Sequence, residues 1–227
     1  MKKLISFLFF IIQIIVFNQI QLFSIDYKHT IPNDNDTIVF LKMEINPNQY
    51  YPKIGDSVDD FTVYTFDNKK FNLKKELAKG KPVLIITGSY SCPIYRYSVP
   101  IINDLQRRYS ELLNIIVLYG CEAHPSDTDA EIFVNNDQGI IYNIPKTYGD
   151  KKIIVEDMLE KIEHQVPVFL DTPNSEVQKM LGLSPNSSFI IDTSGVIVSA
   201  HDMFHQGPKY NIYDDIMNYF NIKLDDE

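Results

Sequence analysis

The sequence predicts an α/β domain with a mixed, mostly parallel sheet that carries helices on both faces. Short apolar runs rich in β-branched residues alternate with longer segments of helical spacing. Such alternation is typical of a parallel sheet between two layers of helices. Two hairpin patterns, one before the first buried run and one near the C-terminus, add antiparallel strands to this sheet.

The predicted elements follow in order from residue 61. Residues 61–66 alternate like a strand, Asp67-Asn68 supplies a turn, and residues 70–73 return as the second arm of an N-terminal β-hairpin. Buried strands are expected at 82–87, 114–119 and 166–170, and a second hairpin at 188–198. Helices are expected at 93–113, 151–163, 174–181 (capped by Gly182) and 210–220, and residues 125–150 are taken as loop.

The first 24 residues have a basic start and then a long apolar run, the pattern of a secretory signal peptide. Residues 4–23 are also about long enough to span a membrane, so a retained N-terminal anchor is the alternative. Both readings place the body of the protein outside the cytosol: secreted, in the periplasm or in the ER lumen. We take residues 25–50 as a linker or irregular lead-in, 51–222 as the single domain and 223–227 as an acidic tail.

Composition excludes several classes of function. The formal net charge is −9 and the only arginine cluster is Arg107-Arg108, which argues against a nucleic-acid partner. Two cysteines are too few for a scaffold built on disulfides. The five histidines show no zinc-site spacing, so we expect no bound metal and no bound cofactor.

Cys92 lies where a predicted strand stops and a predicted helix starts. Pro93 suits the first position of that helix, which places Cys92 at the N-cap, facing unpaired N–H groups and the positive end of the helix dipole. A thiolate is stabilised there, so the sequence predicts a reactive cysteine with a lowered pKa, to which Arg96 could add. The alternative is a buried cysteine that only fills the junction.

Cys121 follows the strand 114–119 as Cys92 follows the strand 82–87. If these strands are neighbours, both thiols lie at the carboxyl edge of the sheet, where the chemistry of open sheets gathers. Adjacent strands are about 4.8 Å apart, and disulfides join Cα atoms up to roughly 6.8 Å apart. We therefore hypothesise that Cys121 resolves oxidised Cys92 through an internal disulfide.

Several motifs resemble the redoxins of the alkyl-hydroperoxide-reductase and thiol-peroxidase group. Pro52–Asp56, Asp60–Thr62 and Gly80–Leu84 look like the entry to their fold, and Pro100 matches the proline that kinks the corresponding helix in thioredoxins. The resemblance implies a thioredoxin-like, three-layer α/β/α domain.

Two central motifs are closer to iodothyronine deiodinases. Gly88–Pro93 is similar to their Gly-Ser-x-Thr-selenocysteine-Pro, with cysteine in place of selenocysteine, and Tyr119–Asp127 is similar to their Tyr-x-Glu-Glu-Ala-His-x-Ser-Asp. Near the end, Gly207–Tyr210 is a shortened form of their Gly-Pro-x-x-Tyr. The match covers roughly residues 52–221. A histidine expected near Lys146–Tyr148 is missing, so thyronine specificity does not carry over.

The resemblance implies a thiol oxidoreductase that acts by reductive dehalogenation. It makes Cys92 the nucleophile and His124 the proton donor, with Glu122 or Ser126 to orient the imidazole. The residues expected to support the nucleophile are Ser89, Ser91, Pro93 and Arg96, and those of a substrate-side loop are Gly207, Pro208 and Tyr210. A small-molecule substrate and an external thiol donor such as thioredoxin or glutathione are the implied partners, and a homodimer stays open.

Two alternatives remain at this point. Ser89, three residues before Cys92, suits a peroxiredoxin-like peroxidase or a general thiol reductase, but no arginine stands on a later strand to hold a peroxide. A dithiol mechanism is disfavoured because Tyr95 fills the second place of Cys-x-x-Cys. The non-enzymatic alternative is a binding protein that uses Tyr90, Tyr95 and Tyr97 as an aromatic surface.

Overall fold

The computed structural model describes residues 27, 30–41, 51–182, 184–204 and 211–222. The predicted leader or anchor 1–24, the loop residues Gly207, Pro208 and Tyr210, and the tail 223–227 lie outside the described residues. In the described part of the chain, no helix combines the length and the apolar character needed to cross a bilayer. The compact unit that contains the sheet begins at Ile31.

A seven-stranded sheet runs through this unit in the order β2-β1-β5-β4-β3-β6-β7. The strands are β1 (Thr62–Tyr64), β2 (Lys70–Asn72), β3 (Val83–Gly88), β4 (Asn114–Tyr119), β5 (Val168–Leu170), β6 (Ser188–Ile191) and β7 (Ile197–His201). Only the pairings β3–β4 and β4–β5 are parallel. The mixed sheet is confirmed, but "mostly parallel" was wrong, because each predicted hairpin pairs antiparallel with the central strands as well as within itself.

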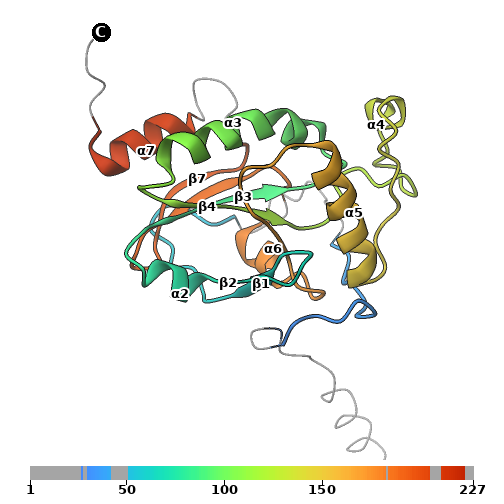
Figure 1. The fold of residues 1–227 in the computed structure, drawn as a ribbon, viewed down its shortest axis with the longest axis horizontal. Coiled ribbons are helices and arrows are strands. Elements are labelled where there is room, and N and C mark those ends of the chain that lie inside the picture. Colours follow the sequence, from blue (N-terminus) through green and yellow to red (C-terminus); the bar gives the residue numbers. More distant parts are fainter. Residues whose placement is uncertain (1–26, 28–29, 42–50, 183, 205–210, 223–227) are drawn as a thin grey trace, which may run out of the picture. The chain divides into compact units, whose positions relative to one another are not determined.

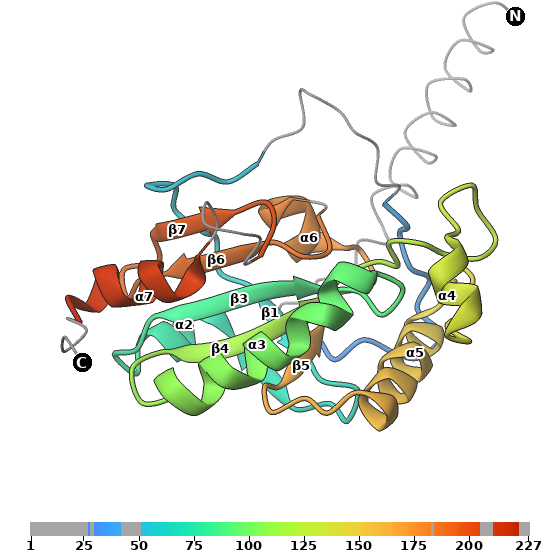
Figure 2. The same ribbon diagram turned by 90° about the horizontal axis from the view of Figure 1, so that it is seen from above.

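Helices cover both faces of the sheet, which confirms the three layers (Figures 1 and 2). The cluster of buried side chains on one face includes α3 (Pro93–Tyr109), α5 (Tyr148–Lys161) and α7 (Ile212–Phe220). The cluster on the other face includes α2 (Leu73–Leu77) and α6 (Glu176–Leu181). The remaining helix, α4 (Phe133–Asp137), lies at the end of the sheet where α3 begins (Figure 2).

The central strands are buried on both sides because their apolar residues are continuous. In β3, Leu84 and Ile86 pack under α3, whereas Val83 and Ile85 pack toward α2 and α6. This division follows from the period of two along a strand. Each such side chain contributes about 1.5–3 kcal/mol when fully buried, so the strand that precedes Cys92 is held rigidly.

Some element ends differ from expectation. The helix α5 begins at Tyr148 rather than 151, because Thr147 and Asp150 form a reciprocal capping box. The helix α3 ends at Tyr109 rather than 113, and α2 was not predicted. Within residues 125–150, where the sequence indicates a loop with room for a helical turn, the structure has the short helix α4. Gly182 does cap α6, with φ of 90°.

Residues 31–41 have no helix or strand, as expected, yet they belong to the domain. The Ile38 amide donates to the Lys146 carbonyl at 2.9 Å, and the Val39 amide donates to the Pro173 carbonyl at 2.7 Å. The Asp36 carbonyl in turn accepts from the first residue of α5. This segment therefore supports the start of α5 instead of acting as a free linker.

A carboxylate links the last helix to the edge of the sheet. The Asp215 Oδ2 atom of α7 accepts a hydrogen bond from the Ser199 hydroxyl of β7 at 2.6 Å and contacts the Nε2 atom of His201. Burial opposes the charge on Asp215, but the hydrogen bonds from His201 and Ser199 outweigh it and lower the pKa of this carboxyl.

Asp215→Asn should lower the free energy of unfolding by about 1 kcal/mol at pH 7. Folding lowers the pKa of Asp215. Its contribution to the free energy of unfolding is therefore complete above the pKa of aspartate in the unfolded chain, and it is lost as the pH falls through the pKa of Asp215 in the folded protein. Denaturant unfolding at pH 7 and at pH 3 measures both effects. Asp214→Asn, in the same turn of α7 but exposed, is the matched control, and an equal loss in both variants would contradict the prediction.

Candidate functional site

Cys92 stands at the N-cap of α3, as the sequence predicts. Its backbone is extended (φ −87°, ψ 111°), Pro93 opens the helix, and the Arg96 amide donates to the Cys92 carbonyl at 3.2 Å. The residue is only 4% exposed. Its thiol lies under the start of α3, in the cluster that fills this face of the sheet.

The predicted lowering of the Cys92 pKa was wrong for this resting structure. Burial raises the pKa of the thiol, and the nearby charge of Glu122 raises it further. The opening amides of α3 and the Arg96 guanidinium act in the opposite direction, but they do not outweigh burial. At neutral pH the thiol is therefore protonated, and a base must take its proton before it can act as a nucleophile.

Glu122 is the carboxylate next to this thiol, and it is 2% exposed. Its Oε2 atom accepts from the Ser91 amide at 3.0 Å and from the Ser89 hydroxyl at 3.3 Å, while its Oε1 atom accepts from the Tyr119 hydroxyl. The same hydroxyl accepts from the Tyr90 amide at 2.9 Å. A buried carboxylate thus joins the loop before Cys92 to the loop after β4.

Two serines complete this connection from the other side. The Ser89 hydroxyl accepts from the Ala123 amide and the Ser91 hydroxyl accepts from the His124 amide, both at 3.0 Å. Both serines are fully buried. The backbone that carries His124 is therefore held directly against the residue that precedes Cys92.

Arg96 is also buried, and its partners come from a region that sequence reasoning missed. Its guanidinium donates to the Tyr90 carbonyl at 2.6 Å, to Asn135 Oδ1 at 2.9 Å and to Gln138 Oε1 at 2.7 Å. The Asn135 amide group donates in turn to the Ser91 carbonyl at 2.8 Å. No motif marks Asn135 of α4 or Gln138 at its C-cap, because only the tertiary fold brings this short helix to the start of α3.

His124 is half-buried at the edge of the site, and its Nδ1 atom lies 2.8 Å from the Ala130 carbonyl. A carbonyl can only accept, so Nδ1 carries a proton, and in the neutral imidazole Nε2 is then the acceptor. Neither expected orienting group has this role: Glu122 bonds to Ser91 and Tyr119, and the Ser126 hydroxyl donates to Asn143 at 2.9 Å. The Ala130 carbonyl orients the imidazole instead.

Cys121, like Cys92, is buried and forms no disulfide. Its Sγ atom accepts from the Gln178 amide of α6 at 3.1 Å, and the fully buried Lys151 and Asp171 lie behind it, joined by a 3.3 Å hydrogen bond from the ammonium to the Asp171 carbonyl. Burial raises the pKa of the Cys121 thiol. An internal disulfide would require Cys121 to give up its hydrogen bond from Gln178.

The proposed aromatic surface is not present. Tyr90 and Tyr95 are buried, and only Tyr97 is exposed. The Tyr95 ring lies so close to Gly88 that a Cβ atom there would come within 2.8 Å of it. Tyr95 therefore fills the space of the second thiol in a Cys-x-x-Cys site.

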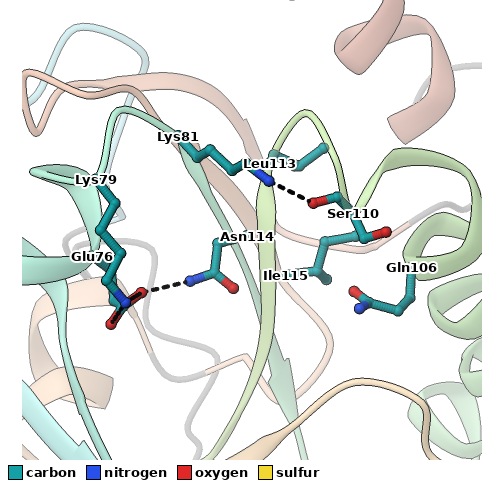
Figure 3. A pocket seen from close by; sticks show the side chains of 8 residues that line it. All are labelled: Glu76, Lys79, Lys81, Gln106, Ser110, Leu113, Asn114 and Ile115. Atoms are coloured by element: carbon teal, nitrogen blue, oxygen red, sulfur yellow. Dashed lines mark hydrogen bonds and ion pairs between the residues drawn. The ribbon is translucent and has the colours of Figure 1, made fainter.

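A small pocket at the opposite edge of the sheet has no connection with these residues. Figure 3 shows its lining: the Lys81 ammonium donates to the Ser110 carbonyl at 3.1 Å, and the Asn114 amide donates to Glu76 at 3.1 Å. Asn114 begins β4, whereas the site follows the end of β3 and β4. The volume is about 120 Å³. Most of its charged and polar side chains are paired within the lining.

Comparisons with known proteins agree with this fold. A family model described as Redoxin matches residues 53–214. The chain belongs to the Redoxin family. The resemblance to redoxins is thereby confirmed. These matches give no support to a deiodinase in particular.

Individual relatives of this redoxin are distant. The methylamine utilization protein MauD of Methylophilus methylotrophus is 27% identical over 132 residues, which cover 52% of the chain and 62% of the relative's length. A structure assigned as the thiol:disulfide interchange protein DsbE of Chlorobium tepidum has a TM-score of 0.52 at 17% identity, over 73% of this chain and 96% of that one. The C-terminal domain of a thiol-disulfide oxidoreductase from Bacteroides thetaiotaomicron has a TM-score of 0.52 at 13% identity, covering 75% and 98%. These two structures show the thioredoxin-like fold.

Two substitutions should move the reactivity of Cys92 in this redoxin in opposite directions. Glu122→Gln removes a charge that raises the pKa of the thiol, so alkylation at pH 7 should become roughly threefold faster or more, because the rate follows the thiolate fraction. Arg96→Gln removes a charge that lowers this pKa, so alkylation should become slower by a similar factor. Iodoacetamide labelling followed by mass spectrometry, in a Cys121→Ser background, measures both. A shift of both variants in the same direction would mean that loosening of the loop dominates over charge.

Proposed function

We propose that this redoxin is a thiol-dependent oxidoreductase in which Cys92 is the nucleophile, His124 moves the proton, and the reaction is reductive dehalogenation of a small molecule. The hydrogen bond from the His124 amide to the Ser91 hydroxyl carries the proposal, because it holds the imidazole-bearing loop beside the residue that precedes the thiol. Glu122 and Arg96 are positioning residues in this scheme.

The buried thiol needs a base, and the tautomer of His124 supplies one. With Nδ1–H donated to the Ala130 carbonyl, the Nε2 lone pair can take the proton of Cys92. The thiolate then attacks the halogen: a sulfur–halogen bond forms, the carbon–halogen bond breaks, and its electron pair goes to carbon. The carbon receives the proton from His124, which returns the imidazole to its starting form.

The electrons for the reaction come from an external thiol. One thiol attacks the Cys92 sulfur, expels halide and forms a mixed disulfide; a second thiol releases Cys92 and leaves as a disulfide with the first. The sum is two thiols and one organic halide giving one disulfide, one reduced product and one hydrogen halide. The Cys121 thiol accepts a hydrogen bond from Gln178 and takes no part in this scheme, so turnover with a small dithiol does not require it.

A location outside the cytosol remains part of the proposal and depends on the N-terminal sequence pattern. Peroxidase or disulfide-reductase activity is the competing function, since Ser89 stands three residues before Cys92. Against peroxidase activity, Arg96 is engaged with α4 and with the Tyr90 carbonyl.

Purified protein should reduce an iodinated phenol with dithiothreitol as electron source, and release iodide. Cys92→Ser should abolish turnover, and His124→Gln should lower kcat by about 10²–10⁴-fold, the usual contribution of a general acid or base. Iodide release and product mass are the measurements. Lys75→Gln, an exposed substitution on α2, is the control for handling and folding.

Hydrogen peroxide and an oxidised protein disulfide are tested in parallel. Faster turnover of either one, still dependent on Cys92, would assign the enzyme to the competing function. Absence of turnover with all three substrates, in a protein whose Cys92 is alkylated at neutral pH, would contradict the enzymatic proposal as a whole.

A further inference from the structure

The short helix α4 and its C-cap supply two amide side chains to the start of α3. Asn135, which is 1% exposed, accepts from the Arg96 guanidinium through Oδ1 at 2.9 Å and donates through Nδ2 to the Ser91 carbonyl at 2.8 Å. Gln138, at the C-cap of α4, accepts from the same guanidinium at 2.7 Å. The two amides therefore hold the immediate neighbours of Cys92.

The orientation of the Asn135 amide is fixed by its two partners. A guanidinium can only donate and a backbone carbonyl can only accept, so Oδ1 faces Arg96 and Nδ2 faces Ser91. A carboxylate at this position would keep the bond to Arg96 but would turn an oxygen toward the Ser91 carbonyl. The position therefore requires a group that offers both a donor and an acceptor and carries no charge.

The buried guanidinium of Arg96 is solvated by neutral oxygens. Its acceptors are the Tyr90 carbonyl and the amide oxygens of Asn135 and Gln138. Within the described part of the chain, no carboxylate forms an ion pair with it. Burying a charge is costly unless the charge is paired or hydrogen-bonded, and here uncharged groups meet that need. The positive charge is thus held in place without being cancelled.

This charge lies beside the nucleophile. The guanidinium reaches the carbonyl of Tyr90, two residues before Cys92, and the Arg96 amide donates to the Cys92 carbonyl at 3.2 Å. The other ionisable groups that interact with the thiol are Glu122, from the loop after β4, and Tyr95 of α3. Burial raises the pKa of Tyr95, so this phenol stays neutral. Arg96 and Glu122 are therefore the two charges, of opposite sign, that act on the thiol.

We propose that Asn135 and Gln138 are positioning residues that hold the Arg96 charge beside Cys92 without neutralising it, and that they set the reactivity of the thiol in this way. The inference rests on the proposed role of Cys92 as nucleophile, but not on a halogenated substrate. The thiolate is the reactive form of a cysteine. A neighbouring positive charge matters most where burial opposes the thiolate, as it does at Cys92.

Two substitutions of Gln138 separate charge from structure. Gln138→Glu keeps the acceptor and adds a negative charge, whereas Gln138→Leu loses the acceptor and adds no charge. Gln138 is exposed, so both variants should fold. In a Cys121→Ser background, iodoacetamide should label Cys92 of the Gln138→Glu protein roughly threefold more slowly at pH 7, which corresponds to a thiol pKa higher by about 0.5. Gln138→Leu should have a smaller effect.

Asn135→Asp extends the test to the buried amide. This variant adds the same charge and also loses the donor to the Ser91 carbonyl, so labelling should be slower than in Gln138→Glu. Asn136→Asp is the matched control, because Asn136 is exposed in the same helix and its side chain bonds to Glu131 instead of Arg96. It should leave the labelling rate unchanged. Thermal unfolding checks each variant, and if Asn135→Asp does not fold, the two Gln138 variants decide alone.

An unchanged labelling rate in Gln138→Glu, or a larger effect of Gln138→Leu than of Gln138→Glu, would overturn the inference. Slower labelling of Gln138→Glu in a protein that shows no Cys92-dependent dehalogenation would keep the inference and reject the proposed reaction. Dehalogenation that depends on Cys92, in a protein whose labelling rate is the same with Gln138 and with Glu at this position, would keep the reaction and reject the inference.

Discussion

The buried carboxylate of Glu122 is the constraint on which the site depends. Taking a carboxylate out of water costs several kcal/mol unless its oxygens are hydrogen-bonded, and here the available donors are the Ser91 amide, the Ser89 hydroxyl and the Tyr119 hydroxyl. The two loops can satisfy Glu122 only in one arrangement. Because β3 and β4 pair in register up to Gly88 and Tyr119, both loops start at the same level, and the carboxylate then sets their relative position.

This arrangement explains why the thiol is protonated at rest despite its place at a helix N-terminus. The helix dipole contributes about 0.3–1 kcal/mol at an exposed position, and burial of an ionised group costs more than this. Cys92 is 4% exposed and has Glu122 nearby, so the neutral form is favoured. Reactivity in such a site requires proton transfer to a base, and in the proposed function that base is His124, on the loop held by Ser91.

The helix α5 connects the site with the rest of the domain in two ways. Lys151 points inward, is 1% exposed, and places a cation behind Cys121 and Asp171; burial lowers the pKa of this ammonium and raises that of Asp171. On the outer side, Ile153 is exposed and, with Tyr142, lines a surface hollow that is open to solvent. One helix, begun by the capping box at Thr147, thus provides both the polar support beneath the sheet edge and the apolar wall beside it.

The sequence by itself determined the α/β class and the strand that ends before Cys92, because both follow from apolar periodicity. It also determined the N-cap position of this cysteine, which follows from Pro93, and the motif at Tyr119–Asp127, whose residues are adjacent in the chain. It did not determine the antiparallel outer pairings, the role of α4, or the direction in which the Cys92 pKa is shifted. Those depend on what packs over each residue from distant parts of the chain. Asn135 reaches Ser91 and Arg96 only through the fold, and the balance between burial and helix dipole is known only once the thiol has neighbours. Local geometry follows from local sequence, whereas solvation and charge environment are properties of the packed structure.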